Sequence, residues 1–284
     1  MKLSVLTWAT PVLLSTLLLS CQGKPAASDA GRAADSSRTA STIKGENVSY
    51  ASDSVNATGF VAYDQNREGR RPIVLVIHEW WGLNDYTRSR VTQLAELGYF
   101  AFAADLYGGG KTAADPKEAQ ALATPFYMNP GLFKSRLEAA LAKAKTFPQA
   151  DTTQVAAIGY CFGGSAVLSA AKMGSPLAGV VSFHGTLAGT PAPIKNRIKA
   201  AFLVCNGQAD LFVKPEDKAV FKKQMDSVGA TYTFKEYPGA LHAFTNPQAT
   251  ALGKKFNMPI AYNAAADSAS WQDMKDFFGR IFHK

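Results

Sequence analysis

The chain has 284 residues, 47% of them hydrophobic and 18% charged, so it is long enough for one large domain or two small ones and too apolar to be wholly disordered. Beyond the first twenty residues no apolar stretch is long enough to span a bilayer, which excludes a multi-span membrane protein, and three cysteines without a C-x-x-C pair are too few for a disulfide scaffold. The formal net charge of +8 comes from scattered basic residues, which favours no nucleic-acid partner.

The N-terminus has the pattern of a secretory signal. Lys2 precedes an apolar run over residues 3–19, so residues 1–20 are predicted to be a lipoprotein-type signal peptide. The ending LLSC at positions 18–21 resembles a bacterial lipobox, which implies that Cys21 is acylated and begins the mature chain. The alternatives are a plain signal peptide cut nearby and an uncleaved anchor. Because Gln22 follows rather than aspartate, lipoprotein sorting in enteric bacteria implies a lipid anchor at the periplasmic face of the outer membrane, in the bacterial cell envelope.

Residues 21–47 are rich in small and polar residues and show no apolar periodicity. Such a composition predicts a flexible tether between the lipid on Cys21 and a folded domain. The domain is predicted to cover residues 48–284, with its start between Val48 and Thr58.

Predicted strands and helices alternate along the rest of the chain. Strands are expected at 58–63, 73–77, 99–104, 155–159, 180–183, 201–205 and 231–237. Helices are expected at 84–97, 132–147, 163–173, 215–228 and 263–282, and Asp115 has the features of a helix N-cap. Strands separated by helices require crossovers, which predicts a single α/β domain with a mostly parallel central sheet and helices on both faces. Sites in such folds lie beyond the carboxyl ends of the strands.

The loop after the predicted strand at 155–159 has the sequence GYCFGG at positions 159–164. A G-x-C-x-G pattern between a strand and a helix is typical of a nucleophile elbow, in which flanking glycines let the chain pass closely around a strained turn. The amides and dipole of the following helix would favour a thiolate at Cys161. The alternative is a buried structural cysteine beside packing glycines.

Two later loops carry an acid and an imidazole. Asp210 lies a few residues beyond the predicted strand at 201–205, and His242 follows the strand at 231–237. Each is a weak signal alone, but the order Cys161, Asp210, His242 is the nucleophile–acid–base order of α/β-hydrolases. The histidine and cysteine spacings predict no metal site, and no cofactor is expected.

The loop HEWWGLN at positions 78–84 occupies the place where α/β-hydrolases supply an oxyanion-hole amide. The backbone amides of Trp80 and Phe162 are therefore the expected oxyanion donors. Glu79 is unexpected there, because a carboxylate beside a thiolate is unfavourable unless one of the two is protonated.

The sequence resembles the dienelactone hydrolase family over about residues 58–284. The resemblance is carried by HEWWGLN at 78–84, ADLYG at 104–108, GYCFGG at 159–164, GQAD at 207–210 and HAF at 242–244. It implies that Cys161 is the nucleophile, His242 the base and Asp210 its orienting acid, and that Glu79 holds the thiol proton until substrate binds. It also implies that the amide donors are those of Trp80 and Phe162.

The sequence departs from this family at one position that matters for substrate choice. Dienelactone-cleaving members carry an arginine shortly after the catalytic histidine, whereas this chain has Asn246 there. Without that cation a carboxylate-bearing lactone is a doubtful substrate, and aromatic side chains are expected to form an apolar pocket instead. The expected pocket residues are Trp81, Tyr107 and Asn246, with Trp80, Phe126 and Tyr127 as further aromatic candidates. The alternative for each aromatic residue is a place in the core.

The function predicted from these features is hydrolysis of a small-molecule ester or enol lactone through a Cys-His-Asp triad and a thioester. One alternative is a non-catalytic cell-envelope lipoprotein that binds a ligand or partner on the same scaffold. A redox pair of Cys161 and Cys205 is a third interpretation, but Cys205 has the pattern of a buried strand residue. The oligomeric state is not predictable from these features.

Overall fold

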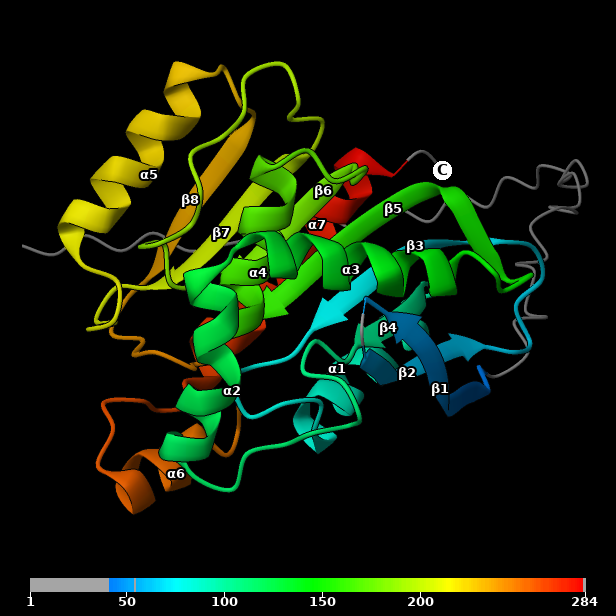
Figure 1. Cartoon of the computed structure of the whole chain (residues 1–284), viewed down its shortest axis with the longest axis horizontal. Helices are drawn as coiled ribbons and strands as arrows, with labels where there is room; N and C mark the ends of the chain where they lie inside the picture. Colours follow the sequence, from blue (N-terminus) through cyan, green and yellow to red (C-terminus); the bar gives the residue numbers. More distant parts are fainter. Residues whose placement is uncertain (1–40, 54, 283–284) are drawn as a thin grey trace, which may run out of the picture. The chain divides into compact units, whose positions relative to one another are not determined.

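An eight-stranded sheet runs through the part of the chain that the structure, a computed structural model, describes: residues 41–53 and 55–282 (Figure 1). The strand order is β1-β2-β4-β3-β5-β6-β7-β8. β1 and β2 pair antiparallel, as do β2 and β4, and all remaining pairs are parallel. This confirms the predicted α/β fold with a mostly parallel sheet. The strands are β1 (Ile43–Ser52), β2 (Val55–Asp64), β3 (Arg71–Ile77), β4 (Phe100–Ala104), β5 (Ala150–Tyr160), β6 (Gly179–Phe183), β7 (Ala201–Gly207) and β8 (Tyr232–Tyr237).

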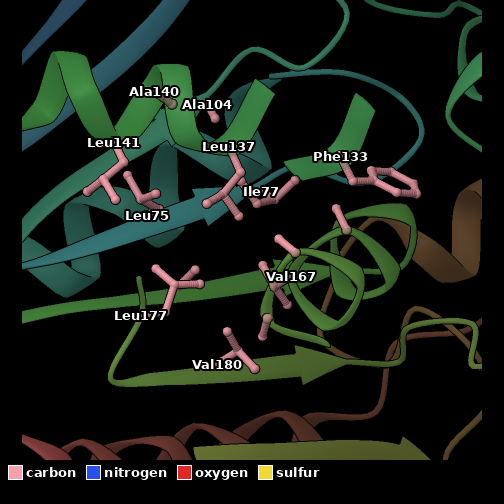
Figure 2. Close-up of a cluster of buried hydrophobic side chains, with 14 of the residues drawn as sticks. Leu75, Ile77, Ala104, Phe133, Leu137, Ala140, Leu141, Val167, Leu177 and Val180 are labelled. Atoms are coloured by element: carbon pink, nitrogen blue, oxygen red, sulfur yellow. The ribbon is translucent and has the colours of Figure 1, made fainter. Parts of the chain in front are cut away.

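Helices cover both faces of the sheet. They are α1 (Asp85–Glu96), α2 (Pro116–Met128), α3 (Gly131–Ala144), α4 (Phe162–Lys172), α5 (Pro215–Ser227), α6 (Ala249–Phe256) and α7 (Ala264–Ile281). The side chains of β3 alternate between two cores: Leu75 faces the core formed with α3 and α4, whereas Val76 faces the core formed with α1 and α7. In Figure 1, α3 and α4 lie in front of the strands and α7 lies behind them. Figure 2 shows the first core, where Leu75 and Ile77 of the sheet face Leu137 of α3 and Val167 of α4.

The domain begins earlier than the sequence predicts. β1 starts at Ile43, so residues 43–47 belong to the sheet and not to the tether, and the predicted boundary at residue 48 is wrong. The cause is backbone pairing, which composition does not reveal: β1 is paired with β2 over its whole length, from Ile43 opposite Asp64 to Ser52 opposite Val55. The signal peptide, Cys21 and the tether up to residue 40 lie outside the described residues. No helix within 41–53 and 55–282 has the length and apolarity needed to cross a membrane.

Polar side chains define where several helices begin. Asn84 precedes α1 and accepts a hydrogen bond from Thr87 N, and Asp115 precedes α2 and accepts one from Glu118 N at 2.9 Å. The predicted N-cap at Asp115 is confirmed. The sequence predicts no helix at α6, because α6 is short, buries only Ala249 and Gly253 and has no side-chain cap.

Candidate active site

Cys161 sits on a tight turn between β5 and α4. Its backbone has φ 52° and ψ −113°, a conformation that residues with a side chain rarely adopt. The flanking glycines make this turn possible, since a Cβ on Gly159 would lie 2.0 Å from the Gly163 carbonyl oxygen. A Cβ on Gly163 would lie 2.3 Å from the carbonyl oxygen of Ile77, at the end of β3. The chain therefore turns sharply where the sequence predicts it, with the cysteine at the apex of the turn.

His242 and Asp210 meet beside this turn from the loops after β8 and β7. His242 Nδ1 lies 2.9 Å from Asp210 Oδ2, and both residues are buried. The acid is itself held in place, because its Oδ1 accepts a hydrogen bond from Phe212 N at 2.8 Å. The backbone of His242 is fixed from the other side by Ala261 N, which donates to the His242 carbonyl at 3.2 Å. The loop that follows α6 thus supports the imidazole.

Cys161 and Asp210 both act on the charge of His242. Burial disfavours the imidazolium, but the negative charge of Cys161 and hydrogen bonds to Asp210 and Cys161 outweigh it and raise the pKa of His242 to about 10. These contacts favour the imidazolium form of the ring, which is placed against the Asp210 carboxylate through Nδ1 and hydrogen-bonds to Cys161.

Glu79 lies in the same cavity but in a different electrostatic environment. It is 2% exposed, and burial raises the pKa of its carboxyl to about 7 against the opposing effects of Asn246, His242 and Arg90. Its Oε2 accepts a hydrogen bond from Asn246 Nδ2 at 2.7 Å. A neutral amide therefore partners Glu79, and burial favours the protonated form of its carboxyl group.

The cavity in front of Cys161 has a volume of about 180 Å³ and is mainly apolar. Among the described residues that line it there is no lysine or arginine. The lining residues are Glu79, Trp80, Trp81, Gln120, Tyr127, Cys161, Thr186, Phe212, His242, Ala243, Met258 and Ile260. The expected pocket residue Trp81 is among them, and so are the aromatic candidates Trp80 and Tyr127.

Three of the residues that the sequence suggests for the pocket do not line the cavity. Tyr107 is buried behind its wall: the ring packs on Phe162 at 5.3 Å, and the hydroxyl donates to the Trp80 carbonyl at 2.9 Å. Phe126 is a core residue that packs on the same two rings. Asn246 is also buried, because its amide is turned toward Glu79 rather than toward the cavity. The predictions for Tyr107 and Asn246 as pocket-lining residues are therefore wrong, although both contact residues that do line the pocket.

The backbone amides expected to form an oxyanion hole belong to Phe162 and Trp80. Phe162 is the first residue of α4, and Trp80 lies in the loop after β3, the strand that pairs with β5. Within the described ranges, neither amide donates a hydrogen bond to another protein group. The same part of the chain contains no group of three or more histidine, cysteine, aspartate or glutamate side chains suited to a metal ion.

From the sequence, His184 ends a strand and is a candidate to line the cleft, but it has no acid near it and receives no role; in the structure it follows β6 directly. This buried histidine accepts a hydrogen bond from Cys161 N at its Nδ1, 3.1 Å away, and its Nε2 lies 2.8 Å from Thr245 Oγ1. Its position at the carboxyl end of the strand next to the turn was the available signal.

The matched residues of a family model cover nearly all of this structure. The model of the dienelactone hydrolase family matches residues 58–282. The chain belongs to the dienelactone hydrolase family. It is a hydrolase, and several of its relatives carry names of that kind. The protein named "Putative carboxymethylenebutenolidase" from Synechocystis sp. is 26% identical to it over 83% of this chain and 96% of the relative.

Solved structures of similar dienelactone hydrolases share the fold. The structure of a dienelactone hydrolase-like promiscuous phosphotriesterase from metagenomic libraries is 31% identical and has a TM-score of 0.78, with 85% of this chain and 99% of that chain covered. A second structure, of a protein named m3DLH, is also 31% identical over the same shares and has a TM-score of 0.80.

Proposed function

We propose that this dienelactone hydrolase family member hydrolyses neutral carboxylic esters or enol lactones through a thioester on Cys161. The observation that carries the proposal is the placement of His242 between the Asp210 carboxylate and the Cys161 sulfur, with its pKa raised to about 10. An imidazolium held beside a sulfur stabilises the thiolate, which is the reactive form of a cysteine nucleophile.

The reaction proceeds in two acyl transfers. The Cys161 thiolate attacks the carbonyl carbon, and the oxyanion that forms is held by the amides of Trp80 and Phe162. The C–O bond to the leaving group breaks as the leaving oxygen takes a proton from the His242 imidazolium, which leaves a thioester. Water then gives a proton to the neutral imidazole and attacks the thioester, and the acid departs as the thiolate–imidazolium pair is restored. In a lactone, the leaving oxygen and the acid remain in one molecule.

The lining of the cavity selects the substrate class. A dienelactone carries a carboxylate, and burying it requires a cation or several donors. The lining residues include no lysine or arginine, and Asn246 replaces the family's arginine and partners Glu79 instead. Trp80, Trp81 and Tyr127 offer aromatic surface to an uncharged group. We therefore assign the cavity to neutral, partly aromatic or short aliphatic acyl groups with good leaving groups.

The test is turnover of a panel of neutral and acidic esters and lactones by the wild type, Cys161→Ala and Cys205→Ala. Cys161→Ala should lose at least about a hundredfold in kcat/KM, while Cys205→Ala, which removes a buried free thiol from β7, should retain turnover. Rapid quenching with an activated ester should reveal, by mass spectrometry, an acyl adduct on Cys161. A Cys161→Ala variant that is folded and fully active would refute the thioester route, and a strong preference for carboxylate-bearing lactones would refute the substrate class.

A neutral phosphotriester belongs in the same panel. One of the similar proteins of known structure is named a promiscuous phosphotriesterase, and the cavity of this chain, which has no lysine or arginine in its lining, suits a neutral triester. We propose this only as a secondary activity, since a thiolate suits carbonyl carbon better than phosphorus.

We also propose that the chain is anchored in the bacterial cell envelope by a lipid on Cys21, at the periplasmic face of the outer membrane. The LLSC ending of the apolar N-terminal run supports this. Cys21→Ser should abolish labelling by a clickable fatty acid and release the protein from the membrane fraction. Unchanged labelling would refute the anchor.

A further inference from the structure

His184 lies between the two loops that carry the proposed nucleophile and base. It follows β6 with φ 41°, and its ring centroid is 5.3 Å from that of His242. Phe244 covers the ring from the side at 5.2 Å, and the side chain has no exposed surface. A fully buried histidine with a positive φ is costly, which points to a specific task for its ring.

Hydrogen bonds on both nitrogens fix the state of this ring. The Cys161 amide is shared between the Phe183 carbonyl at 3.0 Å and His184 Nδ1 at 3.1 Å, so Nδ1 accepts and carries a lone pair. The proton of a neutral imidazole is then on Nε2, which donates to Thr245 Oγ1 at 2.8 Å. The Thr245 hydroxyl also forms a hydrogen bond with Tyr86 Oη, 2.6 Å away. With both nitrogens occupied, His184 has no free site for proton transfer to a substrate.

The partner of this ring belongs to the segment that carries the base. Thr245 is three residues beyond His242, and its carbonyl accepts a hydrogen bond from Arg90 Nη2 at 2.6 Å. Arg90 is on α1 and also pairs with Asp267 of α7. The segment after His242 is thus tied to two helices on one side and to the turn at Cys161 on the other. The His184 ring forms the connection between this segment and the turn at Cys161.

We propose that His184 is a positioning residue, which as a neutral Nε2–H imidazole sets the spacing between the nucleophile loop at Cys161 and the base loop at His242. It acts through its bonds to Cys161 N and Thr245 Oγ1 and does not touch the substrate. The proposal rests on the proposed function, because spacing matters only if Cys161 and His242 react together.

The surroundings of His184 favour the neutral ring. Four charged or titratable groups surround it. The rings of His242 and Tyr160 lie beside the His184 ring, with the Tyr160 centroid 6.1 Å away. Arg90 and Tyr86 are connected to it by their hydrogen bonds to Thr245. Burial, together with the positive charges of His242 and Arg90, holds the pKa of His184 well below its usual range. Protonation of Nδ1 would place its N–H group against the Cys161 N–H and break that hydrogen bond. Because the lowered pKa keeps the ring neutral, the hydrogen bond should persist around neutral pH.

The decisive comparison is Thr245→Val with Thr245→Ser. Valine is nearly isosteric and removes only the hydroxyl, whereas serine keeps it. We expect Thr245→Val to lower kcat on an activated ester by about tenfold to a hundredfold, with KM changed less than about threefold, because a small misplacement of reacting groups lowers the rate of the chemical step. Thr245→Ser should recover most of the loss.

A second measurement needs no substrate. The rate of Cys161 alkylation by iodoacetamide, followed against pH, reports the thiolate–imidazolium pair directly. Thr245→Val should shift this profile and Thr245→Ser should not. At His184 itself, the Phe variant removes both hydrogen bonds of the ring and should lose activity. His184→Asn keeps an acceptor near the position of Nδ1, and His184→Gln keeps a donor near the position of Nε2. Each of these two should retain part of the activity that His184→Phe loses.

Wild-type kcat and a wild-type alkylation profile in both Thr245→Val and His184→Phe would overturn the positioning role. Altered thermal stability with an unchanged profile would also overturn it, because that is the result of a purely structural contact. The proposed function fails separately, through full activity of Cys161→Ala, and that result leaves the alkylation measurement interpretable.

Discussion

Glu79 is a carboxyl group whose proton is governed by its surroundings. Burial raises its pKa to about 7, and the hydrogen bond from Asn246 opposes the shift without supplying a charge. An arginine in place of Asn246 would hold the acid ionised, as an adjacent cation lowers the pKa of a carboxyl. This chain therefore keeps a carboxyl that titrates near neutrality in the cavity with Cys161.

Replacement of Glu79 by glutamine should remove one limb of the pH profile. The amide oxygen of the new side chain can still accept the hydrogen bond from Asn246 but the amide carries no titratable proton, so the dependence of kcat/KM on pH near 7 should disappear.

With Glu79 present, the folded state binds more protons than the unfolded state between pH 4.5 and about 7, and stability falls as pH rises through that range. Glu79→Gln should therefore be more stable than the wild type by about 2–3 kcal/mol at about pH 8 and equal to it below pH 4.5.

Glu96→Gln is the matched control, because Glu96 is an exposed acid at the end of α1. Urea unfolding at several pH values and initial rates from about pH 5 to 9 provide both measurements. If kcat/KM of Glu79→Gln still changes with pH near 7, a group other than Glu79 causes that titration.

Residue by residue, strand ends and chain order are sufficient to predict where Cys161, Asp210 and His242 lie. Each follows a parallel strand at the same edge of the sheet, so the fold brings them together. The directions of Tyr107 and Asn246 are not predictable in this way, because they depend on which neighbour satisfies their polar atoms: the Trp80 carbonyl in one case and Glu79 in the other. His184 has no acid near it in sequence, and its partner Thr245 is 61 residues away.

At the scale of the elements, the turn between β5 and α4 depends on close backbone approach. Gly163 lies in the first turn of α4, against the end of β3. A methyl group there would have to displace main-chain atoms of Ile77 or move α4, and neither element has space to yield in a close-packed interior.

Gly163→Ala should therefore lower the free energy of unfolding by about 1–3 kcal/mol or more, and should reduce activity as Cys161 shifts with the helix. Gly279→Ala is the contrast: Gly279 lies in α7, and a Cβ there meets no atom within 4 Å. It should raise stability by about 0.5 kcal/mol, since alanine restricts the unfolded chain and favours the helix. Thermal and urea unfolding of the two variants test the pair, and a neutral Gly163→Ala would refute the close-packing argument.

Apolar runs and caps predict most of the elements, because α/β strands buried on both faces are continuously apolar. β3 and β4 illustrate this, with every residue of β4 buried. The two failures share one feature: β1 and α6 are short of buried side chains, so no continuous apolar run marks them. Backbone pairing defines β1, and tertiary contact defines α6.

At the scale of the whole molecule, a buried lysine lies among neutral partners. Lys172, in α4, is fully buried, and its Nζ contacts Thr190 Oγ1 at 3.0 Å and Gln224 Oε1 at 3.2 Å. Its ammonium lies 4.7 Å from the centre of the Phe221 ring. Burial lowers the pKa of Lys172 to about 8. The charge is therefore a net cost to the folded state at neutral pH.

Lys172→Met should stabilise the protein by about 1–3 kcal/mol at about pH 7. The folded wild type binds fewer protons than the unfolded chain between pH 8 and 10.5, so wild-type stability rises with pH in that range and the advantage of the variant narrows. The side chains of Thr190 and Gln224 lose their partner in Lys172→Met, but both are half-buried and can turn to form hydrogen bonds with water.

Lys223→Met, at an exposed position of α5, should change stability by less than about 0.5 kcal/mol. Urea unfolding at about pH 7 and about pH 10 measures both variants. If Lys172→Met is no more stable than the wild type near neutral pH, the contacts of the ammonium outweigh its desolvation.

The backbone of Cys161 also limits how this protein can change over generations. A φ of 52° excludes residues branched at Cβ, so threonine is unsuitable at the apex, whereas serine has the same shape as cysteine with oxygen in place of sulfur. An exchange between these two would alter the reactivity of the enzyme while leaving its glycine frame intact. The atom that attacks in the proposed mechanism is thus the feature of this site that evolution can replace with the least disturbance to the scaffold.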